Sequence, residues 1–127
     1  MARAVHEKDR ASYLEISIPM PVTEASMVAV FESVRSELLG SQERRVLVDL
    51  RQGQVDLSIS DLHDLAKRVA TLAGSLEGLA LVLRPQDLLA DKFFEPSVNN
   101  RGIPTLATDD ADEAVYWLTT PMLARKR

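Results

Sequence analysis

Residues 46–50 read VLVDL and residues 79–83 read LALVL, and these two stretches decide the fold class. Both are apolar nearly throughout, instead of alternating between apolar and polar residues. A continuous apolar run is typical of a strand that is covered on both faces, as in the centre of a parallel sheet. We therefore expect two central strands of one sheet, whose following loops, residues 51–59 and 84–87, meet at a shared edge that we call the carboxyl rim.

Four other stretches carry apolar residues at every third or fourth position, which predicts helices that bury one face. The first begins after Thr23, a residue type that caps helix N-termini, and ends at Gly40. The others cover residues 58–72, 85–96 and 108–118. Helices that alternate with strands indicate crossover connections and a mainly parallel sheet.

Three further strands complete the predicted sheet. Residues 13–18 alternate as a half-buried strand does, and residues 2–6 would form a short edge strand before them, with residues 7–10 as the turn. Residues 103–107 form the last strand, and Pro104 places it towards an edge.

The order of elements is β-β-α-β-α-β-α-β-α. It predicts an α/β fold with a mixed, mainly parallel sheet of about five strands and four helices. A length of 127 residues fits one continuous core, so we expect a single domain over residues 1–127.

The composition argues against several kinds of partner and site. A formal net charge of −4 argues against a nucleic-acid binder, because phosphate binding needs a surplus of Lys and Arg on one face. The chain has no cysteine, which excludes a disulfide framework and a thiolate metal site. No window approaches the ~18 apolar residues of a membrane span, and residues 3–10 are charged where a secretory signal would be apolar. We therefore expect no membrane span and a cytoplasmic location.

The usual signs of enzymes are missing from the sequence. Five scattered glycines form neither a dinucleotide fingerprint nor a Walker phosphate loop, and His6 and His63 are not in a metal-ligand spacing. No nucleophile and base can be paired from the sequence. We therefore expect a protein that is not an enzyme, with no cofactor and no metal.

One group of residues at the predicted carboxyl rim has the character of a site. Arg51 and Arg84 follow the two central strands, and Ser58 and Ser60 stand at the start of the helix that comes after the first of them. Free N–H groups and the helix dipole favour an anion at that end of a helix. These four residues form a predicted phosphorylation or anion site, in which the arginines would stabilise a phosphate on either serine.

A simpler alternative accounts for the same residues. Ser58 and Asp61 have a spacing like that of a capping box, and the arginines would then only solvate the strand ends. Caps occur in nearly all helices, whereas binding sites are few in any protein. Both interpretations stay open at the level of the sequence.

The run VLVDL at 46–50, the loop to Ser58 and the helix at 62–72 resemble the STAS domain superfamily. The closer likeness is to its SpoIIAA-like branch of small stand-alone bacterial proteins, which share paired aromatics like Phe93-Phe94 and a final helix ending near a Trp-Leu like Trp117-Leu118. The likeness covers nearly the whole chain.

The resemblance implies a regulatory role. In its signalling members, the anti-sigma-factor antagonists, a serine at the amino end of the second helix is phosphorylated by a partner kinase, and Ser58 falls at about that place. The family signature Asp-Ser-Ser/Thr-Gly is absent, since residues 56–61 read DLSISD. The resemblance also reaches lipid-binding relatives, in which the apolar residues of the helix at 85–96 would line a pocket: Leu88, Leu89, Phe93 and Phe94.

A response-regulator receiver is the rival fold, because Asp49 stands where a receiver has its acceptor aspartate. Receivers also need a pair of acids after the first strand and a lysine after the last. Residues 16–21 contain no acid and residues 103–109 no lysine, so we reject this interpretation.

Two functions follow as hypotheses. The first is a non-enzymatic protein-interaction or regulatory module that docks a protein partner through the carboxyl rim and the exposed side of the second helix. The second is a binding module for a small anionic or lipid-like ligand at the same rim. A homodimer is also expected, because symmetric pairs are the commonest soluble oligomers, although no surface for it can be identified from the sequence.

Overall fold

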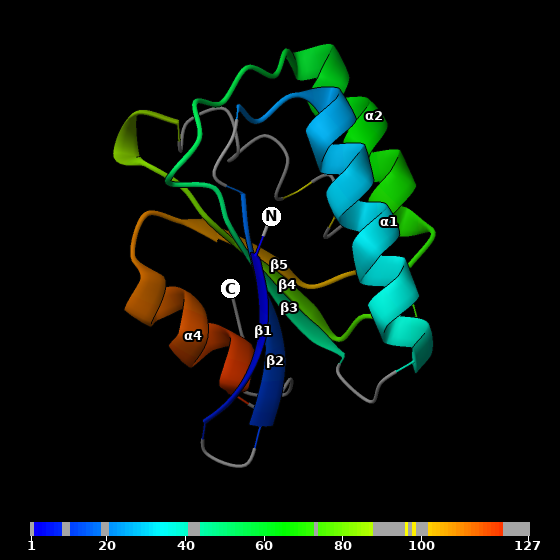
Figure 1. The fold of residues 1–127 in the computed structure, drawn as a ribbon, viewed down its shortest axis with the longest axis vertical. Coiled ribbons are helices and arrows are strands. Elements are labelled where there is room, and N and C mark those ends of the chain that lie inside the picture. Colours follow the sequence, from blue (N-terminus) through cyan, green and yellow to red (C-terminus); the bar gives the residue numbers. More distant parts are fainter. Residues whose placement is uncertain are drawn as a thin grey trace.

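The computed structural model describes residues 2–8, 11–18, 21–40, 44–72, 74–87, 96, 98 and 102–120. One sheet lies between two layers of helix. Figure 1 views the sheet nearly edge-on, with α1 (Glu24–Gly40) and α2 (Ile59–Ala70) on one side and α4 (Ala111–Thr119) on the other. We call the two sides of the sheet the α1/α2 face and the α4 face.

The sheet has five strands in the order β1-β2-β3-β4-β5. Only the first pair, β1 with β2, runs antiparallel, and the other neighbouring pairs are parallel. The strands have these bounds: β1 Ala2–Lys8, β2 Ala11–Ser17, β3 Arg45–Asp49, β4 Gly78–Val82 and β5 Thr105–Thr108. The predicted α/β fold with a mixed, mainly parallel sheet is confirmed.

The two apolar runs form the neighbouring strands β3 and β4, as expected. Their side chains alternate between the two faces: Val46 and Val48 belong to the core under α1 and α2, whereas Leu47 packs with Ala114 and Leu118 of α4. Each of the three β3 residues is at most 4% exposed. The run lacks polar alternation because helices cover both faces.

The helices on the α1/α2 face follow directly from local sequence. Thr23 caps α1: the Ser26 amide donates to the Thr23 hydroxyl (3.2 Å), and the Thr23 amide donates to the Ser26 hydroxyl (2.8 Å). In α2 the apolar residues at helical spacing, Leu62, Leu65 and Val69, are buried in the core. Such an amphipathic stripe holds a helix on a sheet through apolar burial.

The first hairpin is longer than predicted. β1 continues to Lys8 and β2 already begins at Ala11, so residues 7 and 8 of the expected turn at 7–10 are strand, and residues 9 and 10 lie outside the described part. The added pairs are Glu7 with Ser12 and Lys8 with Ala11. Their backbone pairing extends the ladder without an apolar pattern that sequence could reveal.

The expected third helix is described only at its start. Pro85–Asp87 form a short 3-10 helix, and residues 88–101, apart from Pro96 and Val98, lie outside the described part. Three α-helices are therefore described where the sequence predicted four. Within the described ranges, none of the helices has both the length and the apolar character needed to cross a membrane.

Candidate functional site

The loop after β3 is fixed to the segment after β2. Val22 and Val55 form an isolated parallel bridge, in which the Val22 amide donates to the Gln54 carbonyl and the Asp56 amide donates to the Val22 carbonyl, both at 2.8 Å. Val22 is fully buried. The chain therefore enters α2 from a position set by backbone hydrogen bonds.

Ser58 caps α2 through a capping box. The Asp61 amide donates to the Ser58 hydroxyl and the Ser58 amide donates to the Asp61 carboxylate, each at 3.0 Å. The capping interpretation of this spacing is confirmed. The Asp61 carboxylate also brings a negative charge to the amino end of α2, where it interacts favourably with the helix dipole.

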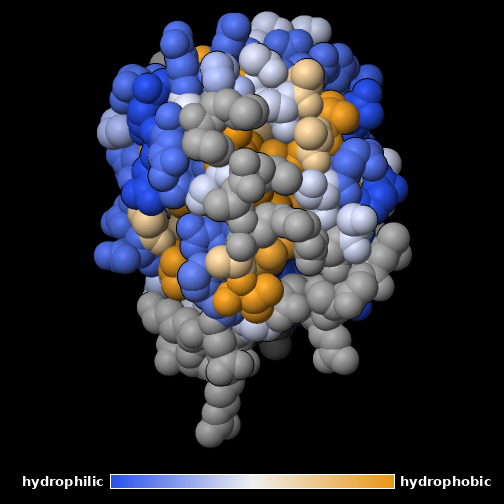
Figure 2. Space-filling view, viewed as in Figure 1, coloured by the Kyte–Doolittle hydropathy of each residue, from blue (hydrophilic) through white to orange (hydrophobic). Residues whose placement is uncertain are grey.

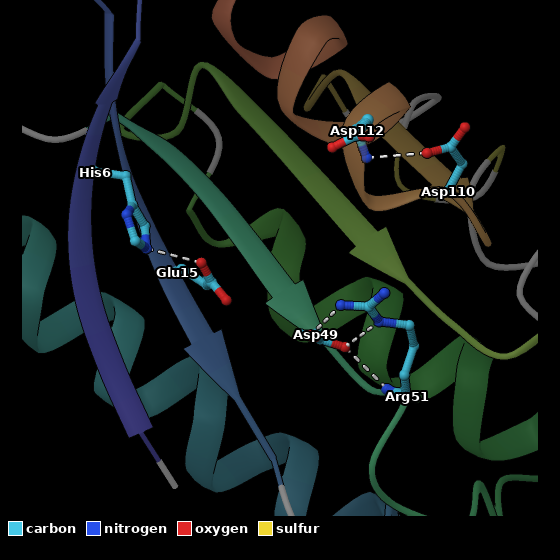
Figure 3. Close-up of polar contacts among 6 residues, drawn as sticks. All are labelled: His6, Glu15, Asp49, Arg51, Asp110 and Asp112. Carbon is cyan, nitrogen blue, oxygen red and sulfur yellow. Dashed lines mark hydrogen bonds and ion pairs between the residues drawn. The ribbon is translucent and has the colours of Figure 1, made fainter.

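Arg51 is held by an acid of its own strand, as Figure 3 shows. Its backbone amide and Nε donate to Asp49 Oδ1 at 3.0 Å, and its Nη2 donates to Oδ2 at 2.8 Å. These hydrogen bonds hold the pKa of the Asp49 carboxyl below its ordinary value, although burial acts in the opposite direction. The same carboxylate raises the pKa of Arg51. Asp49 is 6% exposed, so a neutralising partner is what its burial requires.

Arg84 has a similar partner at the end of β4. Its Nε donates to Asp87 Oδ2 at 2.8 Å, and the Asp87 amide donates to the Arg84 carbonyl at 2.9 Å. Arg51 and Arg84 each follow the last paired residue of their strand, Asp49 and Val82, by two positions. The prediction that both arginines reach the same rim is thus confirmed by the register.

The structure separates Arg51 from Ser58, however. Asp49 follows Leu47 by two positions on β3, so its side chain lies on the α4 face, and Arg51 is bound to it there. Figure 3 views the sheet from the α4 side, with Arg51 in front of it and α2 behind. Ser58 begins the helix on the far side. Arg51 and Ser58 thus lie towards opposite sides of the sheet, and the phosphorylation or anion site of Ser58, Ser60, Arg51 and Arg84 stays a prediction.

The two acids that hold the arginines were not predicted from the sequence. Asp49 was interpreted only as the possible acceptor of a receiver, and Asp87 was given no role. A signal was available, because an acid and an arginine two or three positions apart at a strand end can pair locally. The face of the sheet on which Asp49 lies could also be predicted, since Asp49 and Leu47 are two positions apart on one strand and therefore point to the same face.

One side of α2 is entirely exposed and polar. We call it the α2 outer face, and it consists of Ser60, His63, Asp64, Lys67, Arg68 and Thr71. The Thr71 hydroxyl accepts a hydrogen bond from Arg35 of α1 at 2.7 Å, which ties the two helices together at the surface. This face and the capped start of α2 form one continuous strip beside the loop after β3.

A hollow of about 370 Å³ lies at the other end of the sheet, near the amino ends of β4 and β5. It is lined by Arg44, Gly74, Ser75, Leu76, Glu77, Gly102 and Pro104. It is thus remote from the carboxyl rim. Among the described residues, no group of three or more acidic, histidine or cysteine side chains is arranged to hold a metal ion. The apolar residues proposed to line a lipid pocket, Leu88, Leu89, Phe93 and Phe94, lie outside the described part.

The structure is similar to the crystal structure of an uncharacterized protein of the DUF3478 family, with a SpoIIAA-like fold, from Shewanella loihica PV-4. The two have a TM-score of 0.59 and 18% sequence identity, and the similarity covers 92% of each chain. No family model matches the sequence, and no curated protein matches it either. The fold is therefore SpoIIAA-like, as the resemblance to STAS domains implied.

Proposed function

We propose that this domain is a non-enzymatic regulatory module that docks a protein partner on the α2 outer face and the adjoining loop after β3. The observation that carries the proposal is the contrast between the two sides of α2. Its apolar side is buried in the core. Its other side presents six exposed polar residues, and the loop after β3 that leads into the helix is fixed by hydrogen bonds. The SpoIIAA-like fold supports this, since the anti-sigma-factor antagonists it resembles act by binding proteins.

Rigidity makes this strip suited to a protein partner. The Val22–Val55 bridge, the capping box at Ser58 and the Arg35–Thr71 hydrogen bond each fix a part of it before any partner arrives. A surface that is already ordered loses less conformational entropy on association. The strip also carries both signs of charge, at Asp64 and at Lys67 and Arg68, so it favours a partner with a complementary mixed pattern.

The alternative, a small anionic ligand at the carboxyl rim, has less support. Arg51 and Arg84 already donate to Asp49 and Asp87, and Asp61 occupies the amino end of α2. An incoming anion would have to compete with these carboxylates for the same donors. A flat, preorganised polar surface suits a macromolecule better than a small ion.

Site-specific photo-crosslinking in cells of the source organism tests the proposal. A photoreactive residue is placed at His63 or Lys67 of the α2 outer face, and a matched control is placed at Asp112, which is exposed on α4. We expect a discrete protein crosslinked from positions 63 and 67 and absent from position 112. All three positions are exposed, so the variants keep the fold.

Two results would overturn the proposal. One is the same product at position 112 as at position 63, which would mark the product as non-specific. The other is no protein product from either α2 position under conditions in which the photoreactive residue is fully consumed. Mass spectrometry of the crosslinked peptide identifies the partner residue, so that a second copy of this chain is recognised as such.

A further inference from the structure

The outer edge of β1 is a long, open strand edge. β1 pairs with β2 without a break from Ala2 to Lys8, and the strand order puts it at one end of the sheet. The opposite edge strand, β5, has only four residues. An edge of seven residues without proline or bulge presents a row of backbone N–H and C=O groups that can accept another strand. Within the described ranges, no segment pairs with that outer edge.

β1 is held firmly on the sheet rather than loosely attached. His6 Nε2 lies 2.8 Å from Glu15 Oε1 across the hairpin, and the His6 ring contacts the ring of Tyr13, with 5.2 Å between their centroids. Figure 3 shows the His6–Glu15 contact on the α4 face. Pairing with an ordered edge costs little additional ordering of this chain.

Val5 gives this edge an apolar centre. It is 60% exposed, although its cross-strand partner Leu14 is 3% exposed in the core. Both residues lie on the α1/α2 face, so the apolar surface of that face continues past the helices to the edge of the sheet. Figure 2, which has the same edge-on view as Figure 1, shows hydrophobic residues in the middle of the molecule between hydrophilic flanks.

Symmetry limits how two copies of β1 can pair. A two-fold axis perpendicular to the sheet leaves every side chain on the face that it occupies in the single chain. Directly opposite residues of an antiparallel pair share a face, so the axis must pass through a residue that pairs with its own copy. The register centred on Val5 is the one that uses all seven residues of β1. It makes the following pairs between copies: Ala2 with Lys8, Arg3 with Glu7, Ala4 with His6, and Val5 with Val5.

The charges of β1 select the same register. Centring on Val5 places Arg3 opposite Glu7 of the second copy, twice by symmetry. Centring on Ala4 or on His6 instead pairs one of these charged residues with Val5. Inside the chain, Arg3 and Glu7 stand opposite the uncharged residues Ile16 and Ser12 of β2. Opposite charges directly across two strands stabilise the pair, whereas like charges destabilise it.

We propose that two copies of this chain associate through β1, antiparallel and centred on Val5, so that their two five-stranded sheets become one continuous sheet. The open edge, the exposed valine and the self-complementary charges all point to a second copy as the occupant. β1 is separate from the α2 outer face, so this dimer and the proposed docking of a protein partner stand or fall independently.

Engineered cysteines test the register directly, because the natural chain has none. Directly opposite residues of antiparallel strands have Cα atoms about 4.5–5.5 Å apart, within the range that disulfides span. Under mild oxidation Val5→Cys is expected to give a disulfide-linked dimer. The matched control Tyr116→Cys, 68% exposed on α4, is expected to stay monomeric on a non-reducing gel.

A mixture of two further variants checks the register. In this register residue 4 of one copy lies opposite residue 6 of the other. Ala4→Cys alone and His6→Cys alone are therefore not expected to form a disulfide-linked dimer, whereas a mixture of the two variants is expected to form one. Equal crosslinking of each variant with itself and in the mixture would overturn the register.

Charge reversal tests the same interface without a covalent bond. Arg3→Glu puts two glutamates opposite two glutamates, and sedimentation equilibrium is expected to show a dimer dissociation constant raised roughly tenfold. The double variant Arg3→Glu/Glu7→Arg restores opposite charges and is expected to recover the dimer. A natural protein that is monomeric at all concentrations tested would overturn the proposal. So would a dimer in which Val5→Cys does not crosslink, or one in which the double variant is no stronger than Arg3→Glu.

Discussion

The two faces of the sheet are built in different ways. The α1/α2 face is packed with large apolar side chains such as Ile16, Leu65 and Leu81, all nearly inaccessible to solvent. The α4 face uses the small residues Ala80 and Ala114, which let α4 lie close to the strands. Both faces bury apolar side chains, but the cluster on the α4 face is smaller and includes two alanines where α4 meets the strands.

Polar groups divide between the faces in the same way. On the α4 face the buried side chains include Asp49 and Thr108, and burial, with a smaller contribution from the charge of Glu15, raises the pKa of Tyr13. On the α1/α2 face the buried strand residue Thr105 is uncharged and its hydroxyl donates to the Ile103 carbonyl at 2.9 Å, whereas the charged groups of α2 lie on the outside of the helix. The charged rim residue Arg51 thus neutralises a buried acid of the α4 face, whereas the charged residues of α2 are exposed and form the surface that we propose for docking.

The comparison predicts the largest stability effect on the α1/α2 face. Leu65→Ala should lower the free energy of unfolding by about 2–5 kcal/mol, because it opens a cavity in a fully packed core. Urea unfolding followed by circular dichroism measures this. Val115→Ala, at a partly buried position on α4, is the control and should cost less. A loss below about 1 kcal/mol for Leu65→Ala would contradict the account of this face.

On the α4 face, replacing a small buried side chain by a large one is expected to lower the stability. Ala114→Leu should cost about 1–3 kcal/mol, because its side chain is fully buried where α4 approaches β4. Thermal unfolding measures the effect, and Tyr116→Leu on the exposed side of the same helix is the control. If Ala114→Leu proved as stable as the natural protein, α4 would not pack as closely as described.

The buried acid of the α4 face predicts a dependence on pH. Asp49→Asn should cost about 1–2 kcal/mol at pH 7, because the Arg51 guanidinium loses its carboxylate partner. Since the folded pKa of Asp49 lies below the ordinary 3.8, its contribution is fully present above that value and is lost as the pH falls through the folded pKa.

The natural protein and Asp49→Asn should therefore converge in stability below about pH 4. Urea unfolding at a series of pH values measures the difference between them. A difference that stays constant down to pH 2 would show that the Asp49 charge is not the cause. Asp112→Asn, exposed at the start of α4, is the matched control for a general effect of charge.

The smallest effect belongs to the start of α2. Ser58→Ala should cost about 1 kcal/mol, since it removes the side-chain acceptor of the Asp61 amide. Ser60→Ala, two positions after the cap and exposed, should be close to neutral because no hydrogen bond of the capping box involves its side chain. Equal costs for the two serines in chemical denaturation would mean that the capping box does not stabilise the helix.

The sequence predicted the parts of the fold that rest on apolar pattern. The nearly continuous apolar runs at 46–50 and 79–83 correspond to β3 and β4, because a strand covered on both faces has few polar positions. Pro104 placed the last strand at an edge, and β5 indeed begins just after it. The hairpin was predicted too short, because residues 7 and 8 pair through their backbone and carry no apolar pattern.

The candidate site was predicted less completely. The capping box could be read from the spacing of Ser58 and Asp61. The pairing of Arg51 with Asp49 was missed although their spacing allows it, because an arginine after a strand can also face the solvent. The choice depends on the path of the loop, which the Val22–Val55 bridge fixes from a distant part of the sequence.

Docking on the α2 outer face can be tested by measuring how strongly the crosslinked partner binds two charge-reversal variants. If the α2 outer face docks the partner, Lys67→Glu should raise the dissociation constant roughly tenfold or more in isothermal titration calorimetry, while Asp112→Lys on α4 should leave it unchanged. An unchanged dissociation constant for Lys67→Glu, or an equal loss for Asp112→Lys, would contradict the account.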